Sequence, residues 1–176
     1  MQNRIVLDAP DIDRALKRIA HEILEANEGA KDLVLLGIPT RGAHLAKRIG
    51  KLLSSIDSEF DNQVGVLDIT MYRDDTASAE RKIHATELPA AGIENKTVVL
   101  IDDVLFSGRT VRAALDAITD IGRPSQVKLA VLVDRGHRQL PIRPDFVGKN
   151  LPTALTERVQ VQIQETDQID QVVISQ

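Results

Sequence analysis

The sequence predicts an α/β fold in which helices flank a mainly parallel central sheet. The run 98–101 is apolar without alternation, which suits a strand that is covered on both faces. Residues 110–121 then switch to apolar positions at helical spacing, and further strands are expected at 33–38 and 127–133. Strands that alternate with amphipathic helices favour a parallel sheet, and such sheets bind ligands at the carboxyl ends of their strands.

The first part of the chain is expected to form a helix, a strand and a second helix. The segment Asp8-Ala9-Pro10-Asp11 predicts a helix start, and the helix should end near Gly29. Its apolar stripe is formed by Ile12, Ala15, Leu16, Ile19, Ile23 and Leu24. The strand 33–38 and the turn Pro39-Thr40-Arg41-Gly42 follow. The second helix should face inward with Leu45, Ala46, Ile49, Leu52 and Leu53.

The middle of the chain is expected to hold a strand at 64–70 and then a long connection at 71–87. This connection is polar and charged without a convincing period, and it includes Arg81, Lys82 and His84. We expect it to be a flexible lid loop. The helix after the strand 98–101 should face inward with Val111, Ala114, Leu115, Ile118 and Ile121, and Gly122-Arg123-Pro124 should stop it.

The C-terminal part is expected to form a small hood at about 134–176, beside the main sheet. Residues 135–145 contain two prolines and a glycine, which indicates a shaped loop that stands over the ligand site. From Glu157 the chain alternates apolar and polar residues through Ile163, as in a half-exposed strand that 172–174 could pair with. The whole chain, 1–176, is predicted to be a single domain.

Composition limits the possible functions. The chain has 176 residues, 43% of them hydrophobic, which is enough for one well-buried core. A net charge of −4 means that any nucleic-acid contact needs a local basic patch. The absence of cysteine excludes disulfides and thiol chemistry, and no apolar window approaches the length of a membrane span. We therefore expect a cytoplasmic protein with no membrane partner.

The chemistry predicted from the residues themselves centres on Asp102 and Asp103. Two adjacent carboxylates would repel a bare phosphate, but they can accept hydrogen bonds from the vicinal hydroxyls of a ribose. The turn Ser107-Gly108-Arg109-Thr110 opens a helix and can hold a phosphate through its N–H groups. This pattern indicates a ribose 5-phosphate site. The simpler interpretation is an aspartate-capped strand end followed by a solvated turn.

A second turn between a strand and a helix, Gly37-Ile38-Pro39-Thr40-Arg41-Gly42, offers a hydroxyl and a guanidinium to another anionic group. Taken alone, it would indicate no more than a glycine-bearing connection with a surface arginine. Two anion-binding turns at successive strand ends together suit a pyrophosphate beside the sugar phosphate.

These motifs carry a resemblance to a known family. Residues 98–110 resemble the phosphoribosyl pyrophosphate (PRPP) signature of type I phosphoribosyltransferases. Residues 133–145, with 148–153 behind them, resemble the bifunctional pyrimidine-operon attenuation regulators that are also uracil phosphoribosyltransferases. The order of the other matching segments agrees with that family: 18–22, 40–42, 68–70 and 72–75.

The resemblance implies the type I phosphoribosyltransferase fold and a reaction that joins uracil to the ribose of PRPP, giving UMP and diphosphate. It implies Mg²⁺ bound mainly through PRPP or diphosphate, with no dedicated protein metal site. The implied catalytic residues are Asp102, Asp103 and Arg41, and those that bind uracil are Asp134, Arg135 and Arg138. The implied PRPP and nucleotide site comprises Thr40, Arg41, Gly42, Arg73, Asp102, Asp103, Val104, Leu105, Phe106, Ser107, Gly108, Arg109 and Thr110.

Two further expectations come with the resemblance. Because the loop at 37–42 often carries a strained or cis non-proline peptide in phosphoribosyltransferases, the Thr40–Arg41 bond is the candidate here. A lid at 71–87 would exclude water from the oxocarbenium-like state of the reaction.

The resemblance also implies binding to the leader mRNA of a pyrimidine operon in the presence of UMP or UTP. Basic residues at spacings of three and four lie on one flank of the first helix, and others lie in the C-terminal part. The expected RNA-binding residues are Arg14, Lys17, Arg18, His21, His137, Arg138, Arg143 and Lys149. Without the resemblance, an ordinary solvated surface is the alternative interpretation of these charges. Members of the family are usually homodimers or higher homo-oligomers.

Three alternatives stay open. A purine phosphoribosyltransferase would share the PRPP segment. An RNA-binding attenuation regulator with little catalysis would share the basic residues. An ordinary doubly wound regulatory domain is a weaker alternative, because it leaves both anion-binding turns unexplained.

Overall fold

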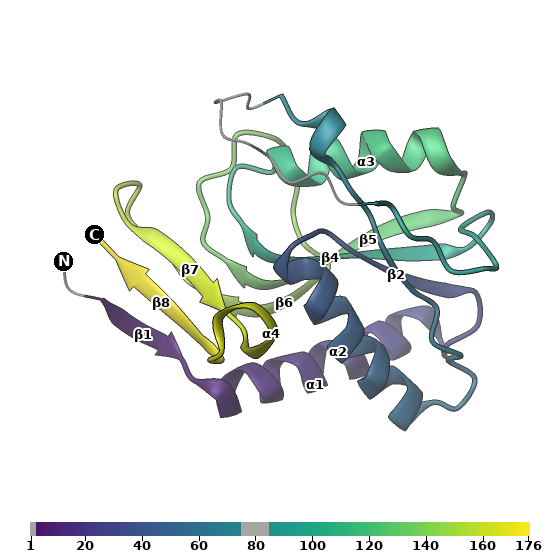
Figure 1. Cartoon of the computed structure of the whole chain (residues 1–176), viewed down its shortest axis with the longest axis horizontal. Coiled ribbons are helices and arrows are strands. Elements are labelled where there is room, and N and C mark those ends of the chain that lie inside the picture. The colour runs from purple at the N-terminus through teal and green to yellow at the C-terminus, as the bar shows by residue number, and fades with distance from the viewer. Residues whose placement is uncertain (1–2, 75–84) are drawn as a thin grey trace.

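The computed structural model describes residues 3–74 and 85–176, and it is built around a parallel sheet of five strands in the order β3-β2-β4-β5-β6. Helices cover both faces of this sheet (Figure 1). One face is covered by α1 (Ala9–Asn27) and α2 (Arg41–Ile56), and the other by α3 (Arg109–Ile121). The strands are β2 (Leu33–Gly37), β3 (Val64–Val66), β4 (Thr97–Leu105), β5 (Gln126–Asp134) and β6 (Phe146–Asn150).

The central strands are buried on both faces, as their unbroken apolar runs predict. Leu33, Leu35 and Val99 pack with α1 and α2 in one core cluster. Val34 and Leu100 belong to a second cluster, which is formed with α3. Successive side chains of a strand point to opposite faces, so one apolar run supplies both clusters.

The ends of α1 lie close to where the sequence places them. Asp8 is the N-cap, and it exchanges hydrogen bonds with Asp11, because each carboxylate accepts the other residue's backbone N–H. At the other end Glu28 adopts a left-handed conformation, and the N–H of Gly29 donates to the carbonyl of Leu24 (2.9 Å). These are the satisfied helix termini that the capping residues predict.

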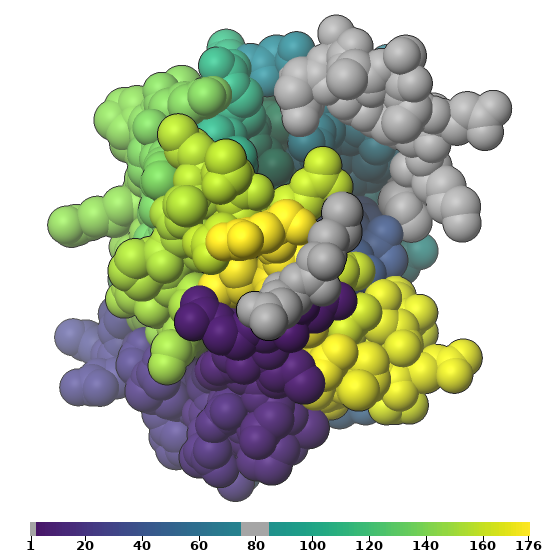
Figure 2. Space-filling view, turned by 90° about the vertical axis from the view of Figure 1, so that its left-hand side faces the viewer, coloured from purple at the N-terminus to yellow at the C-terminus, as the bar shows by residue number. Residues whose placement is uncertain are grey.

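A second sheet lies beside the first and consists of β1 (Arg4–Leu7), β8 (Gln171–Ser175) and β7 (Arg158–Gln162), all antiparallel. The short helix α4 (Gln164–Asp167) connects β7 to β8. We call this sheet and α4 the hood. The predicted pairing of the strand after Glu157 with 172–174 is confirmed. Figure 2 shows the N-terminal segment beside the C-terminal strand on one face of the molecule.

Several predicted boundaries are wrong. The strand expected at 64–70 ends at Val66, because Asp68 accepts hydrogen bonds from the N–H and hydroxyl of Thr70 and turns the chain into a 3₁₀ helix, η1 (Thr70–Tyr72). Residues 146–150 belong to the edge of the main sheet as β6 and not to the hood. The strand β1 has no counterpart in the sequence-based prediction.

The inward face of α3 also differs from the expected one. Leu115 and Ile121 are 39% and 36% exposed, whereas Ala113 and Ala117 are buried against the sheet. Small alanine side chains therefore lie where α3 comes closest to the sheet.

The expected lid at 71–87 falls largely on residues 75–84, with Asp75, Arg81, Lys82 and His84, which lie outside the described residues. That residues 1–176 form a single domain stays a prediction.

Candidate functional site

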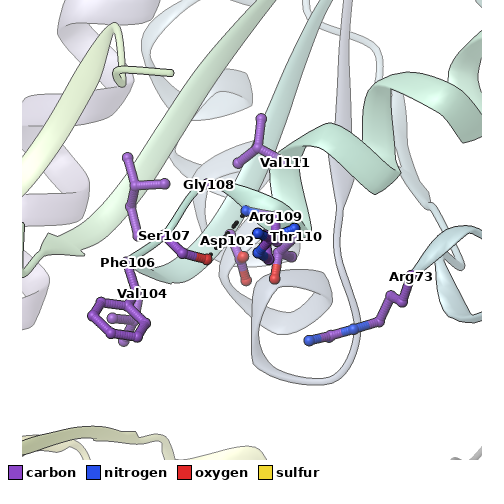
Figure 3. Close-up of a pocket in the computed structure, with 10 residues that line it drawn as sticks. Arg73, Asp102, Val104, Phe106, Ser107, Gly108, Arg109, Thr110 and Val111 are labelled. Atoms are coloured by element: carbon purple, nitrogen blue, oxygen red, sulfur yellow. Dashed lines mark hydrogen bonds between the residues drawn. The ribbon is translucent and has the colours of Figure 1, made fainter. Parts of the chain in front are cut away.

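A cavity of about 140 Å³ lies where β4 meets α3 (Figure 3). Nine residues of the expected PRPP site line it, together with Val111. Arg73 extends towards the others from the segment that follows η1. The lining residues are Arg73, Asp102, Val104, Leu105, Phe106, Ser107, Gly108, Arg109, Thr110 and Val111.

The turn before α3 has the geometry of an anion site. Gly108 is the N-cap residue of α3 and has φ 92°, a left-handed conformation that favours glycine. The N–H of Arg109 donates to Oγ of Ser107 (3.3 Å). The first N–H groups of a helix have no carbonyl one turn earlier to bond, so they and the helix dipole favour an anion here.

The two carboxylates lie inside β4, whereas the sequence predicts them after its end. Pairing with β5 continues past them, because Asp102 is opposite Val131 and Leu105 is opposite Asp134. Adjacent side chains of a strand point to opposite faces, so Asp102 lies on the face of α3 and Asp103 on the face of α2. The acidic pair therefore reaches both sides of the strand.

The two carboxylates differ in burial. Asp102 is only 8% exposed and accepts a hydrogen bond from the N–H of Asp103 (2.9 Å). Burial raises the pKa of Asp102 well above its ordinary value, and the neighbouring charge of Asp103 raises it further. Asp103 is only partly buried and accepts a hydrogen bond from the N–H of Val104 (2.8 Å). Asp103 is therefore the more accessible anion of the pair.

The second predicted turn lies directly beside the first. The N–H of Ile38 donates to the carbonyl of Ile101 (2.9 Å). A Cβ on Gly42 would lie 2.5 Å from that carbonyl oxygen and 3.2 Å from Cα of Asp102, so no side chain fits there. The glycine thus lets the start of α2 rest on β4 beside the acidic pair. The cis peptide bond is Pro39–Thr40 and not Thr40–Arg41, one bond earlier than expected.

Asp103, Thr40, Arg41 and Gly42 do not line the cavity of Figure 3, and the guanidinium of Arg41 has a protein partner. Arg41 donates to Asp167 of the hood from Nη2 (2.7 Å) and from Nε (3.1 Å). The hydrogen bond to Asp167 raises the pKa of Arg41, and the charge of Asp103 raises it as well. Asp167 was missed by sequence reasoning, because it lies 126 positions from Arg41 in a segment without a motif.

The loop after β5 packs on the turn before α3, as expected for a loop over the site. The N–H groups of Gln139 (2.9 Å) and Leu140 (3.2 Å) both donate to the carbonyl of Ser107. Arg138 pairs with Asp134 (2.5 Å) and donates to the carbonyl of Phe106 (3.0 Å). The loop and the turn therefore form one connected surface.

Arg135 is 7% exposed, and its guanidinium donates to Thr153, to the carbonyl of Ala154 and to the carbonyl of Glu157. It also lies over the ring of Phe106, 4.3 Å from the centroid. These contacts connect the site to the segment that enters the hood. Binding of uracil by Asp134, Arg135 and Arg138 stays a prediction.

Tyr72 and Asp74, in the described first part of the expected lid, are held against α3 by hydrogen bonds. Tyr72 donates from its hydroxyl to Asp120 (2.6 Å), a bond that raises the pKa of Tyr72. Asp74 accepts hydrogen bonds from Arg109 (2.9 Å) and Arg112 (3.1 Å). The guanidinium of Arg109 also donates to Gln139 (2.9 Å), and the expected contact of Arg109 with phosphate stays a prediction.

The expected RNA-binding residues fall into separate groups. Arg18 donates from Nη2 to the carbonyls of Val147 and Gly148 (2.7 Å each), which places exposed α1 residues beside Lys149 on β6. Arg14 and Lys17 line a groove between α1, α2 and the segment of α4, with a volume of about 710 Å³. His137 contacts the carbonyl of Thr153, Arg138 contacts the site, and Arg143 is exposed.

Among residues 3–74 and 85–176, no three His, Cys, Asp or Glu side chains gather closely enough to bind a metal ion. None of the helices in the described part of the chain has the length and hydropathy that crossing a membrane requires.

Comparison with known proteins identifies the family. Residues 2–166 match the model of the phosphoribosyl transferase domain. The chain is 61% identical to "Bifunctional protein PyrR" of Streptomyces coelicolor, over 97% of this chain and 89% of that protein. It is 58% identical to the protein of the same name from Leifsonia xyli, over 100% of this chain and 98% of that protein.

Solved structures confirm the predicted fold. A hypoxanthine phosphoribosyltransferase from Trypanosoma cruzi superposes with a TM-score of 0.72 at 18% identity, over 98% of this chain and 94% of that one. A hypoxanthine phosphoribosyltransferase from Staphylococcus aureus gives a TM-score of 0.65 at 23% identity, over 85% of this chain and 77% of that one. The chain therefore has the type I phosphoribosyltransferase fold and belongs to the phosphoribosyl transferase domain family, within the group of bifunctional PyrR proteins.

Proposed function

We propose that this protein is a uracil phosphoribosyltransferase that also regulates a pyrimidine operon by binding its leader mRNA in the presence of a uridine nucleotide. The observation that carries the enzymatic part is the close approach of three elements. Asp102 and the turn before α3 line one cavity, and the turn before α2 lies against the same stretch of β4, because Gly42 rests on Ile101 and Asp102. One site thus offers groups for a ribose, a 5′-phosphate and a diphosphate.

In this proposal each group has a distinct role. The N–H groups from Ser107 to Thr110 hold the 5′-phosphate, and Thr40 and Arg41 hold the diphosphate. Asp102 and Asp103 accept hydrogen bonds from the ribose hydroxyls. When the bond from the anomeric carbon to diphosphate breaks and the bond to N1 of uracil forms, positive charge develops on the ribose ring. The negative charge of the acidic pair favours that charge, diphosphate leaves with its electron pair, and N1 of uracil releases its proton to water.

The residues present fit Mg²⁺ bound mainly through PRPP. A hard cation prefers oxygen ligands and keeps several waters, so a few carboxylates are enough when the substrate supplies phosphate oxygens. Asp103 is the partly exposed carboxylate that would contact such an ion, and no larger acidic cluster is present among the described residues. When bound, Mg²⁺ neutralises charge on the diphosphate.

The regulatory part is supported by the relatives' name, "Bifunctional protein PyrR", and by the basic surface formed by α1 and β6. Arg18, His21 and Lys149 are exposed there, and Arg18 joins the two elements through the carbonyls of β6. A local patch of this kind suits a phosphate backbone on an otherwise acidic protein. Cytoplasmic location and a homo-oligomeric state are parts of the same proposal.

A purine phosphoribosyltransferase is the second candidate, favoured by the superposition on hypoxanthine phosphoribosyltransferases. That likeness is below 25% identity and concerns the fold. Formation of UMP from uracil, PRPP and Mg²⁺, compared with formation of IMP from hypoxanthine, separates the candidates. We expect UMP only, and a preference for hypoxanthine would overturn the proposal.

The first prediction concerns Asp103. The substitution Asp103→Asn should lower kcat by about 100-fold, because it removes the accessible charge that faces the ribose. The thermal midpoint should stay close to that of the wild type, since the amide oxygen can still accept the N–H of Val104. Asp61→Asn, at an exposed position outside the site, is the matched control. Unchanged kcat in Asp103→Asn would contradict the role.

The second prediction concerns RNA. Lys149→Gln should weaken UMP-dependent binding of the pyrimidine leader RNA and reduce its salt dependence by about one phosphate contact, while UMP formation stays unchanged. Lys31→Gln, also exposed but beyond the end of α1, should leave binding unchanged. Arg138 is a poorer probe, because it also contacts Phe106. Equal effects of Lys149→Gln and Lys31→Gln would count against this surface.

A further inference from the structure

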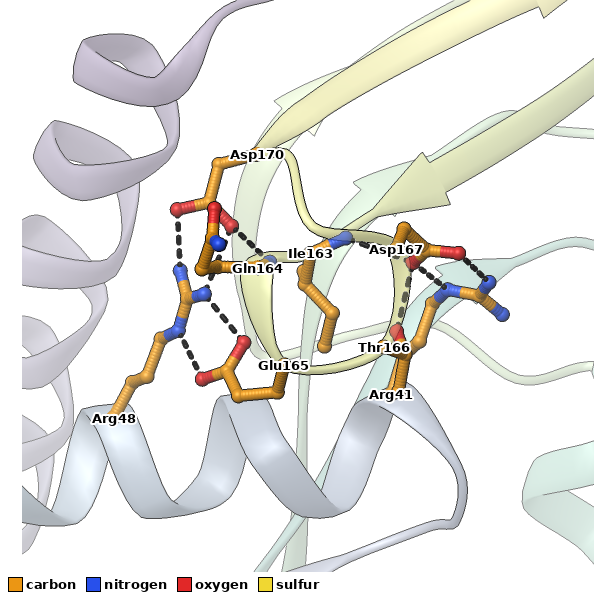
Figure 4. A network of polar contacts seen from close by, with 8 residues as sticks. All are labelled: Arg41, Arg48, Ile163, Gln164, Glu165, Thr166, Asp167 and Asp170. Atoms are coloured by element: carbon orange, nitrogen blue, oxygen red, sulfur yellow. Dashed lines mark hydrogen bonds and ion pairs between the residues drawn. The ribbon is translucent and has the colours of Figure 1, made fainter.

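The hood is attached to α2 by two separate sets of ion pairs (Figure 4). Arg48 binds both Glu165 (2.6 Å) and Asp170 (2.8 Å), one at each end of the α4 segment. Arg41, two turns earlier on α2, binds Asp167 (2.7 Å). The first set involves no residue of the candidate site. The second set involves Arg41, which belongs to the turn that rests on Asp102 through Gly42.

The carboxylate of Asp167 is itself held firmly. Its Oδ2 accepts the N–H of Ile163 (2.9 Å) and the hydroxyl of Thr166 (2.7 Å), in addition to Nε of Arg41 (3.1 Å). Its side chain is only 16% exposed. The hydrogen bond from Arg41 lowers the pKa of Asp167 to about 2, so the group is ionised at neutral pH. Asp167 is thus an ionised group whose position is set by its hydrogen bonds from Ile163, Thr166 and Arg41.

The pairing leaves part of the Arg41 guanidinium available. Asp167 binds the edge formed by Nε and Nη2, and within the described residues Nη1 makes no hydrogen bond. The side chain is 29% exposed, and the nearby charge of Asp103 acts on it. An arginine fork has two edges, so one carboxylate can hold the first edge while the second edge binds a phosphate oxygen.

We propose that Asp167 is a positioning residue, which orients Arg41 so that its free edge binds the diphosphate of PRPP. This inference rests on the proposed function, because it takes Arg41 as a diphosphate ligand. It makes the hood a part of the PRPP site, although no hood side chain lines the cavity of Figure 3.

A purely structural role, in which the Arg41–Asp167 contact only attaches the hood to α2, explains this contact less well. Arg48 already attaches the same segment through four hydrogen bonds to two carboxylates. A long arginine side chain loses rotamer freedom when it binds a ligand, and a partner that fixes it beforehand reduces that loss. Asp167 binds Arg41, the arginine of α2 that the proposed site uses, by the edge formed by Nε and Nη2.

The test is direct binding of PRPP and Mg²⁺ by calorimetry, which requires no catalysis, together with steady-state kinetics. Asp167→Asn should raise the dissociation constant and KM for PRPP about tenfold, because it weakens the ionic contact that orients Arg41. KM for uracil should stay unchanged. Asp167→Glu, which keeps the charge, should recover part of the loss.

Arg48→Gln is the matched control, since it removes the other attachment of the same segment. It should lower the thermal midpoint at least as much as Asp167→Asn and leave PRPP binding unchanged. In an Arg41→Gln background, Asp167→Asn should cause no further loss of PRPP binding, because its effect passes through Arg41.

Two outcomes would contradict the inference. Equal losses of PRPP binding in Arg48→Gln and Asp167→Asn would make the contact structural, and tighter binding in Asp167→Asn would mean that Asp167 holds Arg41 away from the ligand. Either result overturns the inference and leaves the proposed function intact. If the wild type binds no PRPP, the proposed function fails, and this inference fails with it.

Discussion

At the residue scale, Asp102 carries a carboxyl group whose burial disfavours the ionised form. It is 8% exposed in a strand, beside a second carboxylate. Arg73 opposes the rise in its pKa, but burial and Asp103 have the larger effects. Such a placement lowers stability at neutral pH, and the ribose that the site is proposed to bind gives the buried carboxyl group a functional reason.

This placement leads to a prediction about pH. A carboxyl group whose pKa is raised in the folded state causes no loss of stability below its unfolded value of about 3.8. As pH rises above that value, Asp102 ionises in the unfolded state before it ionises in the folded state. The free energy of unfolding therefore falls until pH passes the raised pKa of the folded state. Asp102→Asn removes this effect and keeps the oxygen that accepts the N–H of Asp103. Its thermal midpoint should therefore exceed that of the wild type near neutral pH.

The measurement is the thermal midpoint of both proteins from acidic to neutral pH. The difference should grow with pH, while the variant forms UMP more slowly than the wild type. A difference that is the same at every pH would show that the substitution acts through packing and not through ionisation.

At the element scale, the start of α2 illustrates how a helix and a strand build the site together. The backbone of α2 approaches β4 so closely that Gly42 meets the carbonyl of Ile101. Gly42→Ala should lower the free energy of unfolding by about 1–3 kcal/mol, because neither backbone can yield easily. It should also weaken PRPP binding, since the turn moves away from the acidic pair.

Gly92→Ala is a useful comparison for this prediction. Gly92 has φ 64°, and a Cβ there would meet nothing within 4 Å. Its substitution should reduce stability by about 1–2 kcal/mol through backbone strain and leave PRPP binding unchanged. Chemical denaturation and calorimetry of both variants separate the effect of the close contact between backbones from the effect of backbone strain. Unaltered PRPP binding in Gly42→Ala would contradict the proposed role of the contact.

The elements also differ in how well the sequence predicts them. The helices α1 and α2 and the strands β2 and β5 lie close to their predicted ranges, because caps, glycines and long apolar runs are local signals. By contrast, β1 and β6 contain no long apolar run, and each becomes a strand by pairing with β8 or β5. No local pattern specifies a partner that is distant in the chain.

At the scale of the whole molecule, the hood is joined to α2 by ion pairs whose carboxylates titrate in acid. The hydrogen bond from Arg48 lowers the pKa of Glu165, and the one from Arg41 lowers the pKa of Asp167 to about 2. Groups with a depressed folded pKa contribute stability that is present above the unfolded value and is lost as pH falls through the folded one. For Asp167 that range extends from about 3.8 down to about 2.

We therefore expect the hood to loosen before the main sheet as pH falls below about 4. Amide hydrogen exchange of β7 and β8, corrected for intrinsic rates, should accelerate more than that of β4 and β5. Arg48→Gln should show faster hood exchange already at neutral pH. Uniform acceleration across both sheets would mean that the hood is not a separate unit in acid.

The sequence by itself determined the α/β class, the two glycine-bearing turns between a strand and a helix, the acidic pair between them and the family. These features depend on short segments whose chemistry is local: an apolar run, a small-residue turn, two adjacent carboxylates. Only the tertiary structure decided that Arg41 meets Asp167, that the expected RNA-binding residues lie in separate groups, and that β1 completes the hood. Such contacts join distant segments, and their positions follow from how the helices and sheets pack, which no local pattern encodes.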